Sequence, residues 1–298
     1  MMGQNEDEVL ERAVQLFLRL RDRPDDHAIL AERDAFLARG PAERAAYEKA
    51  QNAWRATSHP RRGGPLKLIL LIAAAGAGAM LLAEPIRIAT LADLSTNREP
   101  EGARLASGDA VTLDADSALV DESGDGNRDV QLLRGAAYFE VAPDGRPFLV
   151  SVDDVEIEVL GTAFEVAVIE DEVAVTVGEG EVEVRTDGAS RQLEAGDRLT
   201  RTDDGALSVT EVDPDDVATW RRGQLIVDGM TVAQVAAVID RRLPGQIVIL
   251  DSALAEARVA GTFDLENPLN ALRTLAAIHG ATVYAAPPLM TVMFPQDF

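Results

Sequence analysis

The chain has 298 residues, of which 28 are Lys or Arg and 51 are Asp or Glu, so its formal net charge is −23. The first 65 residues carry 11 residues of each sign, and the whole negative balance therefore lies after them. Such an acidic part is repelled by nucleic acid and by anionic lipid, so we expect no direct contact with nucleic acid. The absence of cysteine excludes disulfides and thiol chemistry.

Residues 6–54 predict three amphipathic helices, because apolar residues recur at helical spacing in each segment. Pro24 ends the first helix, and Gly40-Pro41 ends the second and starts a third that continues to Trp54. We therefore expect a small all-α bundle over residues 1–57. Because so small a core is marginal by itself, its apolar residues can serve either as internal core or as a face for a partner.

A single uncharged apolar run, Leu68–Ala83, follows a basic tether over residues 58–67. From Leu66 to Ala83 a helix would span about 27 Å, close to the thickness of a bilayer's hydrocarbon core. We predict one transmembrane helix over residues 68–84. Basic residues flank only its N-terminal side, and the positive-inside rule therefore places the N-terminus in the cytoplasm and the C-terminus in the periplasm. The prediction is a bacterial inner-membrane protein with a single membrane pass.

Two other interpretations of the apolar run treat it as part of an export signal. Ala77-Gly78-Ala79 would suit a signal peptidase, but about sixty helix-patterned residues precede the run, which is unlike a cleaved signal peptide. Arg61-Arg62 loosely resembles a twin-arginine export signal, although the spacing to the apolar run is imperfect. We favour a retained anchor.

Residues 85–213 predict a β-rich periplasmic domain. Short alternating or valine-rich runs are broken by turn residues, which is typical of a sandwich, a barrel or a small β-roll. Glu156 and Glu158, and again Glu181 and Glu183, alternate with valine or isoleucine. These acids are expected to mark solvent-facing sides of strands.

Residues 214–298 predict a C-terminal α+β module with the element order βαββαβ. Thr231 and Gln234 form a capping-box pattern at the start of one helix, Asn267-Pro268 starts the other, and Gly280 stops it. Each helix is apolar on one face, so both are expected to cover one side of a small sheet. A sheet edge would then stay open for pairing with another chain.

The residues do not form the constellations that enzymes or metal sites require. His27, His59 and His279 lie far apart in the sequence, without a partner at ligand or catalytic spacing. The segment from Asp121 begins like a calcium loop, but its twelfth position is Leu132 where a bidentate glutamate is needed, so a hairpin turn is favoured. We expect no enzymatic activity, no metal and no cofactor.

Several local strings carry a family resemblance that covers nearly the whole chain. One of them is Gly135-Ala-Ala-Tyr-Phe-Glu-Val141, and another is Trp220-Arg-Arg-Gly-Gln-Leu225. The others lie at residues 19–21, 35–37, 43–47, 53–54, 111–117, 147–150, 161–166, 175–180, 195–197 and 261–263. Together they resemble the FecR family of transmembrane regulators, the anti-sigma partners in bacterial cell-surface signalling. The last part also resembles the short N-terminal module of secretins and TonB-dependent transducers.

The resemblance implies that the cytoplasmic domain binds an extracytoplasmic-function sigma factor. A sigma factor is helical, so an apolar helix face is the natural contact. The candidate contacts are Leu16, Phe17, Phe36 and Trp54. Core packing explains these residues equally well. The family usually has tryptophan where this chain has Leu16 and Phe36, and these residues lack the indole N–H.

The resemblance also implies that the periplasmic part receives a signal from a TonB-dependent outer-membrane transducer and so controls iron-uptake-type genes. Strand addition to the C-terminal module would provide that contact. The candidate transducer contacts are Leu225, Ile226, Val227, Val259 and Phe263. A single helix transmits torque poorly, so release of the sigma factor would follow cleavage near the membrane by an intramembrane protease.

Two other functions remain open from the sequence. Secretin-like modules also build oligomeric rings, so the chain could be a structural scaffold of the periplasmic envelope. A membrane-tethered enzyme acting on carbohydrate would need paired acids such as Asp153-Asp154, but no aromatic cluster that could bind a sugar accompanies them.

Overall fold

The computed structural model describes residues 27–40, residues 90–296 apart from 125, 187 and 287–289, and eight further positions between residues 12 and 47. The chain divides into two compact units, residues 1–78 and 79–298. The basic tether and the expected membrane span, residues 58–84, lie outside the described residues. Of the helices that are described, none is long and apolar enough to cross a membrane.

The first unit contains helix α2 (His27–Leu37). The helical positions described outside it are Arg12, Ala13, Leu16, Leu20, Glu43, Arg44, Ala46 and Tyr47. At all of these positions the structure is helical, as the periodicity predicts. The buried side chains of this unit form one small cluster, which consists of Ala13, Leu16, Phe36 and Tyr47.

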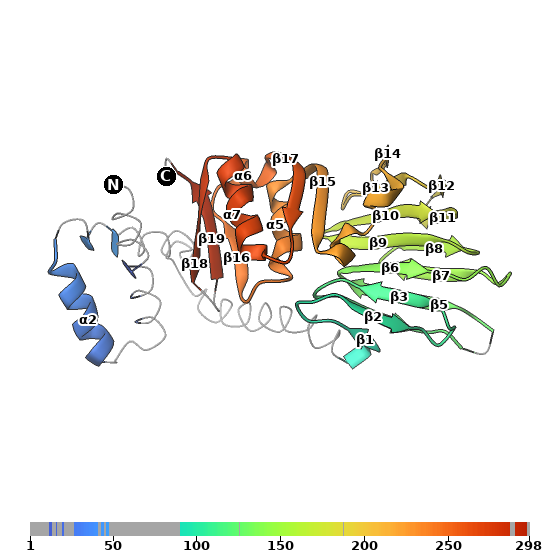
Figure 1. Cartoon of the computed structure of the whole chain (residues 1–298), viewed down its shortest axis with the longest axis horizontal. Helices are drawn as coiled ribbons and strands as arrows, with labels where there is room; N and C mark the ends of the chain where they lie inside the picture. The colour runs from blue at the N-terminus through green and yellow to red at the C-terminus, as the bar shows by residue number, and fades with distance from the viewer. Residues whose placement is uncertain are drawn as a thin grey trace, which may run out of the picture. The chain divides into compact units, whose positions relative to one another are not determined.

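Two seven-stranded sheets form the β-rich part of the second unit (Figure 1). The first sheet has the order β1 (Leu94–Ser95), β4 (Ala118–Asp121), β5 (Asp129–Arg134), β7 (Phe148–Val152), β8 (Val155–Val159), β11 (Glu181–Thr186), β12 (Ala189–Glu194). The second has the order β14 (Leu207–Glu211), β13 (Asp197–Arg201), β10 (Glu172–Glu179), β9 (Ala163–Ile169), β6 (Ala136–Glu140), β3 (Ala110–Leu113), β2 (Glu101–Arg104). Neighbouring strands are antiparallel except β5 and β7. The expected β-rich fold is confirmed, and of the architectures considered it is a sandwich.

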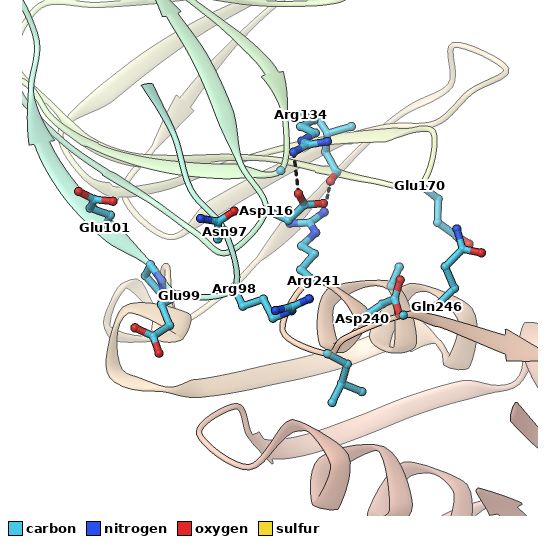
Figure 2. Close-up of a pocket in the computed structure, with 16 residues that line it drawn as sticks. Asn97, Arg98, Glu99, Glu101, Asp116, Arg134, Glu170, Asp240, Arg241 and Gln246 are labelled. Atoms are coloured by element: carbon cyan, nitrogen blue, oxygen red, sulfur yellow. Dashed lines mark hydrogen bonds and ion pairs between the residues drawn. The ribbon is translucent and has the colours of Figure 1, made fainter. Parts of the chain in front are cut away.

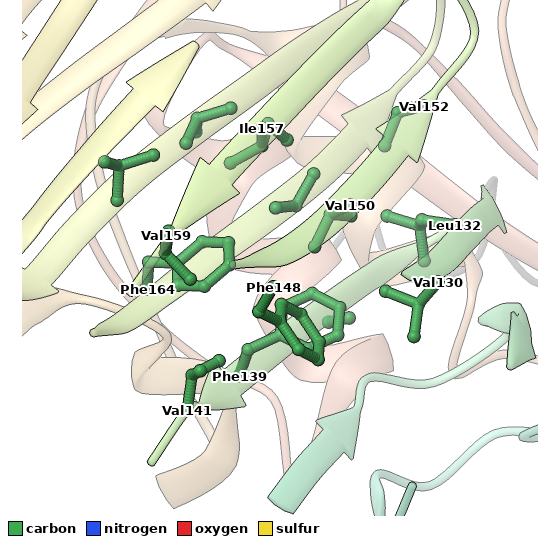
Figure 3. Packing of buried hydrophobic residues seen from close by; sticks show 14 of the residues in the cluster. Val130, Leu132, Phe139, Val141, Phe148, Val150, Val152, Ile157, Val159 and Phe164 are labelled. Carbon is green, nitrogen blue, oxygen red and sulfur yellow. The ribbon is translucent and has the colours of Figure 1, made fainter. Parts of the chain in front are cut away.

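Residues from both sheets share one core, and aromatic rings mark its centre (Figure 3). The ring of Phe139 stacks on Phe164 with centroids 5.2 Å apart and lies 5.6 Å from Phe148 of the opposite sheet. All three side chains are fully buried. Since burying one such side chain stabilises a fold by roughly 1.5–3 kcal/mol, these rings hold the two sheets together.

The alternation of acids and aliphatic residues has the predicted orientation. In β8, Val155, Ile157 and Val159 are buried in the core, whereas Glu156 is exposed. Glu158 accepts a hydrogen bond from Arg185 of the paired strand β11 at 2.7 Å. The acids therefore lie on the solvent face of the first sheet.

The C-terminal module follows the sandwich through two short 3₁₀ turns, η1 (Pro214–Asp216) and η2 (Thr219–Arg222). Its elements are β15 (Gln224–Thr231), α5 (Val232–Asp240), β16 (Gln246–Ile249), α6 (Ser252–Glu256), β17 (Arg258–Asp264), α7 (Pro268–Ile278), β18 (Ala281–Ala286) and β19 (Met290–Pro295). Strands β15 and β17 form one sheet, and β16, β19 and β18 form another in that order. Helix α5 packs against β15 and β16, and α7 against β17 and β18, so the helices lie between the two sheets (Figure 1).

This arrangement corrects the expectation of one sheet covered on one side. Helix α5 buries five of its nine residues, a face too wide for a single sheet to cover. The order βαββαβ also omitted α6, a helix of only five residues that begins where Asp251 accepts the N–H of Leu254 at 2.7 Å. Such a short helix has no periodicity to recognise.

The helix signals of this module are largely confirmed. Thr231 and Gln234 exchange the two capping-box hydrogen bonds, at 3.1 and 2.9 Å. Helix α7 starts at Pro268 and stops before Gly280, which has a φ of +62°. Asn267 makes no side-chain cap bond and instead donates to Asp264 at 2.7 Å.

Candidate functional site

The structure describes two of the four predicted sigma-factor contacts. Leu16 and Phe36 are 1% and 4% exposed and pack together with Ala13 and Tyr47. Phe17 and Trp54 lie outside the described residues. The exposed positions of α2 are instead small or charged, among them Ala31 and Ala35. A partner that leaves this cluster intact would therefore contact α2 through that exposed face.

Of the five predicted transducer contacts, four are core residues of the C-terminal module. Leu225, Val227, Val259 and Phe263 are between 2% and 9% exposed and belong to the core around the two helices. Ile226 is half-buried. The side chains therefore hold β15 and β17 onto α5 and α7, and a partner would meet these strands through their backbone.

The backbone of β17 has an open edge. Leu265 donates to the carbonyl of Gly223 at 2.8 Å, so these two residues form a hydrogen-bonded pair. In an antiparallel ladder, hydrogen-bonded and non-hydrogen-bonded pairs alternate along the two strands, here β15 and β17. Ala260 and Thr262 consequently point their N–H and C=O groups away from β15. Both residues are exposed, and in the described part of the chain no other strand pairs with this edge. Such an edge can accept an added strand.

The module packs against the sandwich through η2 and α5. Trp220 is 5% exposed, and its indole N–H donates to the carboxylate of Glu165 on β9 at 2.5 Å. Arg221 lies over the ring of Tyr138 on β6, with its guanidinium carbon 3.6 Å from the centroid. Burial raises the pKa of the Glu165 carboxyl above its ordinary value. The nearby Arg198 and the hydrogen bond from Trp220 lower this pKa, but by less than burial raises it.

A buried ion pair joins the same two parts. Arg242, the second residue after α5, pairs with Asp114, which follows β3, and their side chains are 6% and 1% exposed. The neighbouring Arg241 donates to the carbonyl of Val168 on β9. Burial raises the pKa of Asp114, while Arg242 offsets part of that rise. We call these contacts of Arg241 and Arg242, together with the hydrogen bond between Trp220 and Glu165, the junction.

An open cavity of about 1340 Å³ lies beside the junction (Figure 2). Arg134 and Asp116 form an ion pair at 2.7 Å on its sandwich side, and Arg241 points toward them. Its three arginines face five acids, so the lining has no single sign of charge that would select an anion or a cation. None of the 16 residues that line it carries a hydroxyl, thiol, amine or imidazole.

The two other acidic segments that the sequence suggested as possible sites, Asp153-Asp154 and the segment from Asp121, lie in connections between strands. Asp153 and Asp154 form the turn between β7 and β8, and Asp154 pairs with Arg201 at 2.6 Å. The segment after Asp121 joins β4 to β5, which are antiparallel. Within the described residues no group of three metal-ligating side chains occurs.

Sequence reasoning missed the junction. Asp114, Glu165 and Trp220 all lie in strings that carry the family resemblance, but none was considered as a contact between domains. A signal was present, because Glu165 is a lone carboxylate inside an otherwise apolar strand. Such a group needs a buried partner.

The sandwich and its packed α+β module place the chain among β-rich proteins with several sheets and a few helices. Residues 93–183 match the family model described as FecR protein. The chain therefore carries a FecR domain.

The fold has counterparts among solved structures. Two crystal structures of a proposed anti-sigma factor from Parabacteroides distasonis ATCC 8503 superpose with TM-scores of 0.63 and 0.62 at 22% sequence identity. Each covers 68% of this chain and 98% of the other chain. No curated protein has a matching sequence. At 22% identity, this similarity shows a shared fold and no more.

Proposed function

We propose that the chain is an anti-sigma regulator, which binds an extracytoplasmic-function sigma factor through its first unit and receives a signal through its second. The observation that carries the proposal is the FecR domain over residues 93–183. The shared fold with a proposed anti-sigma factor supports it. The apolar run Leu68–Ala83 supports a single membrane pass between the two units, with the first unit in the cytoplasm and the second in the periplasm.

The sigma factor is proposed to contact the first unit on the exposed side of α2, since Leu16 and Phe36 are already packed within the unit. The test is capture of the sigma factor by the full chain from its own host. Ala35→Arg places a large charge on the exposed face and is expected to abolish capture without unfolding the helix. Arg39→Ala, also at an exposed position of this segment, is the matched control and should retain capture.

The signal is proposed to come from a TonB-dependent outer-membrane transducer that adds a strand to β17. Support comes from the open, exposed edge at Ala260 and Thr262. Thr262→Pro removes an N–H that no strand of the module uses, so the module should fold and induction should fail. Thr262→Ser keeps the N–H and should signal normally. Loss of induction in both variants would contradict backbone pairing at this edge.

Iron-uptake-type genes are the proposed targets, and an intramembrane protease is the proposed means of release. A reporter for the sigma factor's genes should rise on induction while the chain is shortened near residues 68–84. Persistence of the intact chain throughout induction would contradict release by proteolysis. A structural scaffold, in contrast, would bind no sigma factor in the capture experiment.

A further inference from the structure

A second, smaller cavity lies between α5, β16 and α6 of the C-terminal module. Its volume is about 290 Å³, at the lower end for ligand sites. Two of the residues that line it are acidic: Glu170, from the turn between β9 and β10, and Asp240, the last residue of α5. The others are apolar, namely Ala233, Ala236, Ala237, Ile247, Ile249 and Ala255. The wall of this cavity is therefore apolar, with two carboxylates and no cation.

The two carboxylates have no positive partner. Among the described residues neither Glu170 nor Asp240 forms an ion pair. One oxygen of Asp240 accepts the N–H of Ile247 at 2.8 Å. Burial raises the pKa of Asp240, and burial together with Asp171 and Glu172 raises the pKa of Glu170. A bound cation would offset both shifts, because it favours the charged form of each carboxyl.

The nearest arginines in the sequence are used elsewhere. Arg241 and Arg242 follow Asp240 directly. Arg241 donates to the carbonyl of Val168, and Arg242 pairs with Asp114. In Figure 2, Asp240 lies to the right of the ion pair toward which Arg241 points. These two arginines hold the junction, so they leave the carboxylates of the smaller cavity available to a bound cation.

The backbone of β16 has open groups beside the same cavity. Strand β16 is an outer strand, parallel to β19. Leu250 donates to the carbonyl of Met293 at 3.0 Å, and every second residue of a parallel strand bonds to the same neighbour. Ile247 and Ile249 consequently direct their N–H and C=O groups away from β19. Asp240 takes the N–H of Ile247, whereas Ile249 has no strand partner on this side in the described part of the chain.

We propose that the smaller cavity binds a lysine side chain that is carried by an extended segment of a partner protein. The aliphatic stem of lysine would lie among the alanines and isoleucines, and its ammonium group would reach Glu170 and Asp240. The backbone groups of Ile249 favour an extended peptide over an isolated amine. The residues after the first 65 carry 17 basic and 40 acidic side chains, a balance that attracts a basic partner and repels a second copy.

The bound lysine would contact both parts of the second unit. Glu170 belongs to the sandwich and Asp240 to the module, and both also line the larger cavity beside the junction. Binding would therefore hold the module against the sandwich. The cavity involves neither strand of the β15–β17 sheet, so this inference does not depend on how the transducer binds.

The first test measures peptide binding to the purified full chain by isothermal titration calorimetry. The probe is acetyl-Thr-Val-Lys-Val-Thr-amide, and its matched control has norleucine in place of lysine, which keeps the aliphatic stem and removes the ammonium group. We expect saturable binding of the lysine peptide, and binding about tenfold weaker or more for the norleucine peptide. n-Butylamine by itself offers the stem and the charge without a backbone, and it should bind more weakly than the lysine peptide.

Two substitutions separate the cavity from the overall charge of the chain. Glu170→Gln removes one charge from the cavity wall and should weaken binding of the lysine peptide about threefold to tenfold. Asp171→Asn removes one charge from the next residue, which is exposed and lines neither cavity, and should leave binding unchanged. Equal weakening by both variants would mean that overall charge attracts the peptide, and would overturn the proposal.

Ala233→Leu tests the apolar part of the wall. The larger side chain fills the cavity, and leucine is a good helix former, so α5 should form while binding of the lysine peptide is lost. Ala277→Leu, at an exposed position of α7, is the matched control and should bind the peptide normally. If Ala233→Leu fails to fold, Glu170→Gln still decides, because Glu170 is exposed in a turn.

Three results of the titration overturn the proposal. They are no saturable binding of the lysine peptide, equal binding of the lysine and norleucine peptides, and binding of n-butylamine as tight as that of the lysine peptide. Sigma-factor capture by Glu170→Gln should stay normal, so failure here is distinct from failure of the anti-sigma function.

Discussion

The sandwich and the C-terminal module treat their strand edges differently. Among the outer strands of the sandwich, β1 has two residues, β2 has four with a charge at each end, and β12 carries Arg191 in its middle. In the module, β17 has seven residues, and its middle is uncharged and exposed at Ala260 and Thr262. Since proteins protect edges that should not pair, this difference supports the proposal that the module is the part that receives a partner strand.

The largest expected loss of stability comes from a substitution in the core of the sandwich. Phe139→Ala removes a fully buried ring that touches Phe148 and Phe164. We expect the free energy of unfolding to fall by about 3–5 kcal/mol, measured by denaturant titration. Phe139→Leu keeps most of the volume and should cost much less. An equal cost for both would mean that the ring contacts contribute little.

Removing the buried ion pair of the junction should lower the free energy of unfolding by nearly as much. Arg242→Met leaves Asp114 buried without its cation, which costs about 3–5 kcal/mol. Adding Asp114→Leu removes the unpaired charge and should recover most of that loss. Additive losses in the double variant would show that the two side chains do not act as a pair.

The pH dependence should differ in sign between a carboxylate at the junction, Glu165, and a carboxylate inside the sandwich, Asp109. Burial raises the folded-state pKa of Glu165, so its contribution to stability falls as pH rises from its ordinary value through the raised one. For Asp109 in the sandwich, burial is outweighed by hydrogen bonds from Ser107, Ala142 and Arg128, and its pKa is lowered. Its contribution is therefore present above the ordinary pKa and lost as pH falls through the lowered one.

Single substitutions separate these two contributions. Glu165→Gln should remove the loss of stability toward neutral pH, while the amide still accepts the bond from Trp220. Asp109→Asn should remove part of the loss toward acid. The measurement is the free energy of unfolding from pH 3 to pH 8. A Glu165→Gln profile parallel to that of the parent chain would contradict the junction's role.

The smallest effect on stability is expected at the binding edges. Thr262→Pro changes an outward N–H and should cost less than about 1 kcal/mol, within the range of ordinary surface substitutions. Its effect should be on transducer-dependent induction alone. Calorimetry and a transcription reporter on the same variant check both halves of this statement.

Much of the fold could be predicted because short-range signals agree with it. The alternation of Val155, Ile157 and Val159 with acids fixed the faces of β8, and the capping box at Thr231 located α5. The division of the module into two sheets could not be predicted, because it depends on how the wide apolar face of α5 is shared between β15 and β16.

The candidate contacts were harder to predict for a related reason. Apolar side chains such as Phe36 and Phe263 satisfy the same pattern whether they face a partner or a core, and the structure buries both. The open edges are backbone features, and periodicity carries no information about which strands are outermost. The junction pairs Asp114 with Arg242, 128 residues apart, beyond the reach of any local pattern.

The most direct test of the central claim is capture of a sigma factor by the full chain in its own host. The regulator account predicts one sigma factor, recovered at a fixed ratio to the chain before induction and released after it. Recovery of no sigma factor from cells in which the chain is intact and folded would contradict the account.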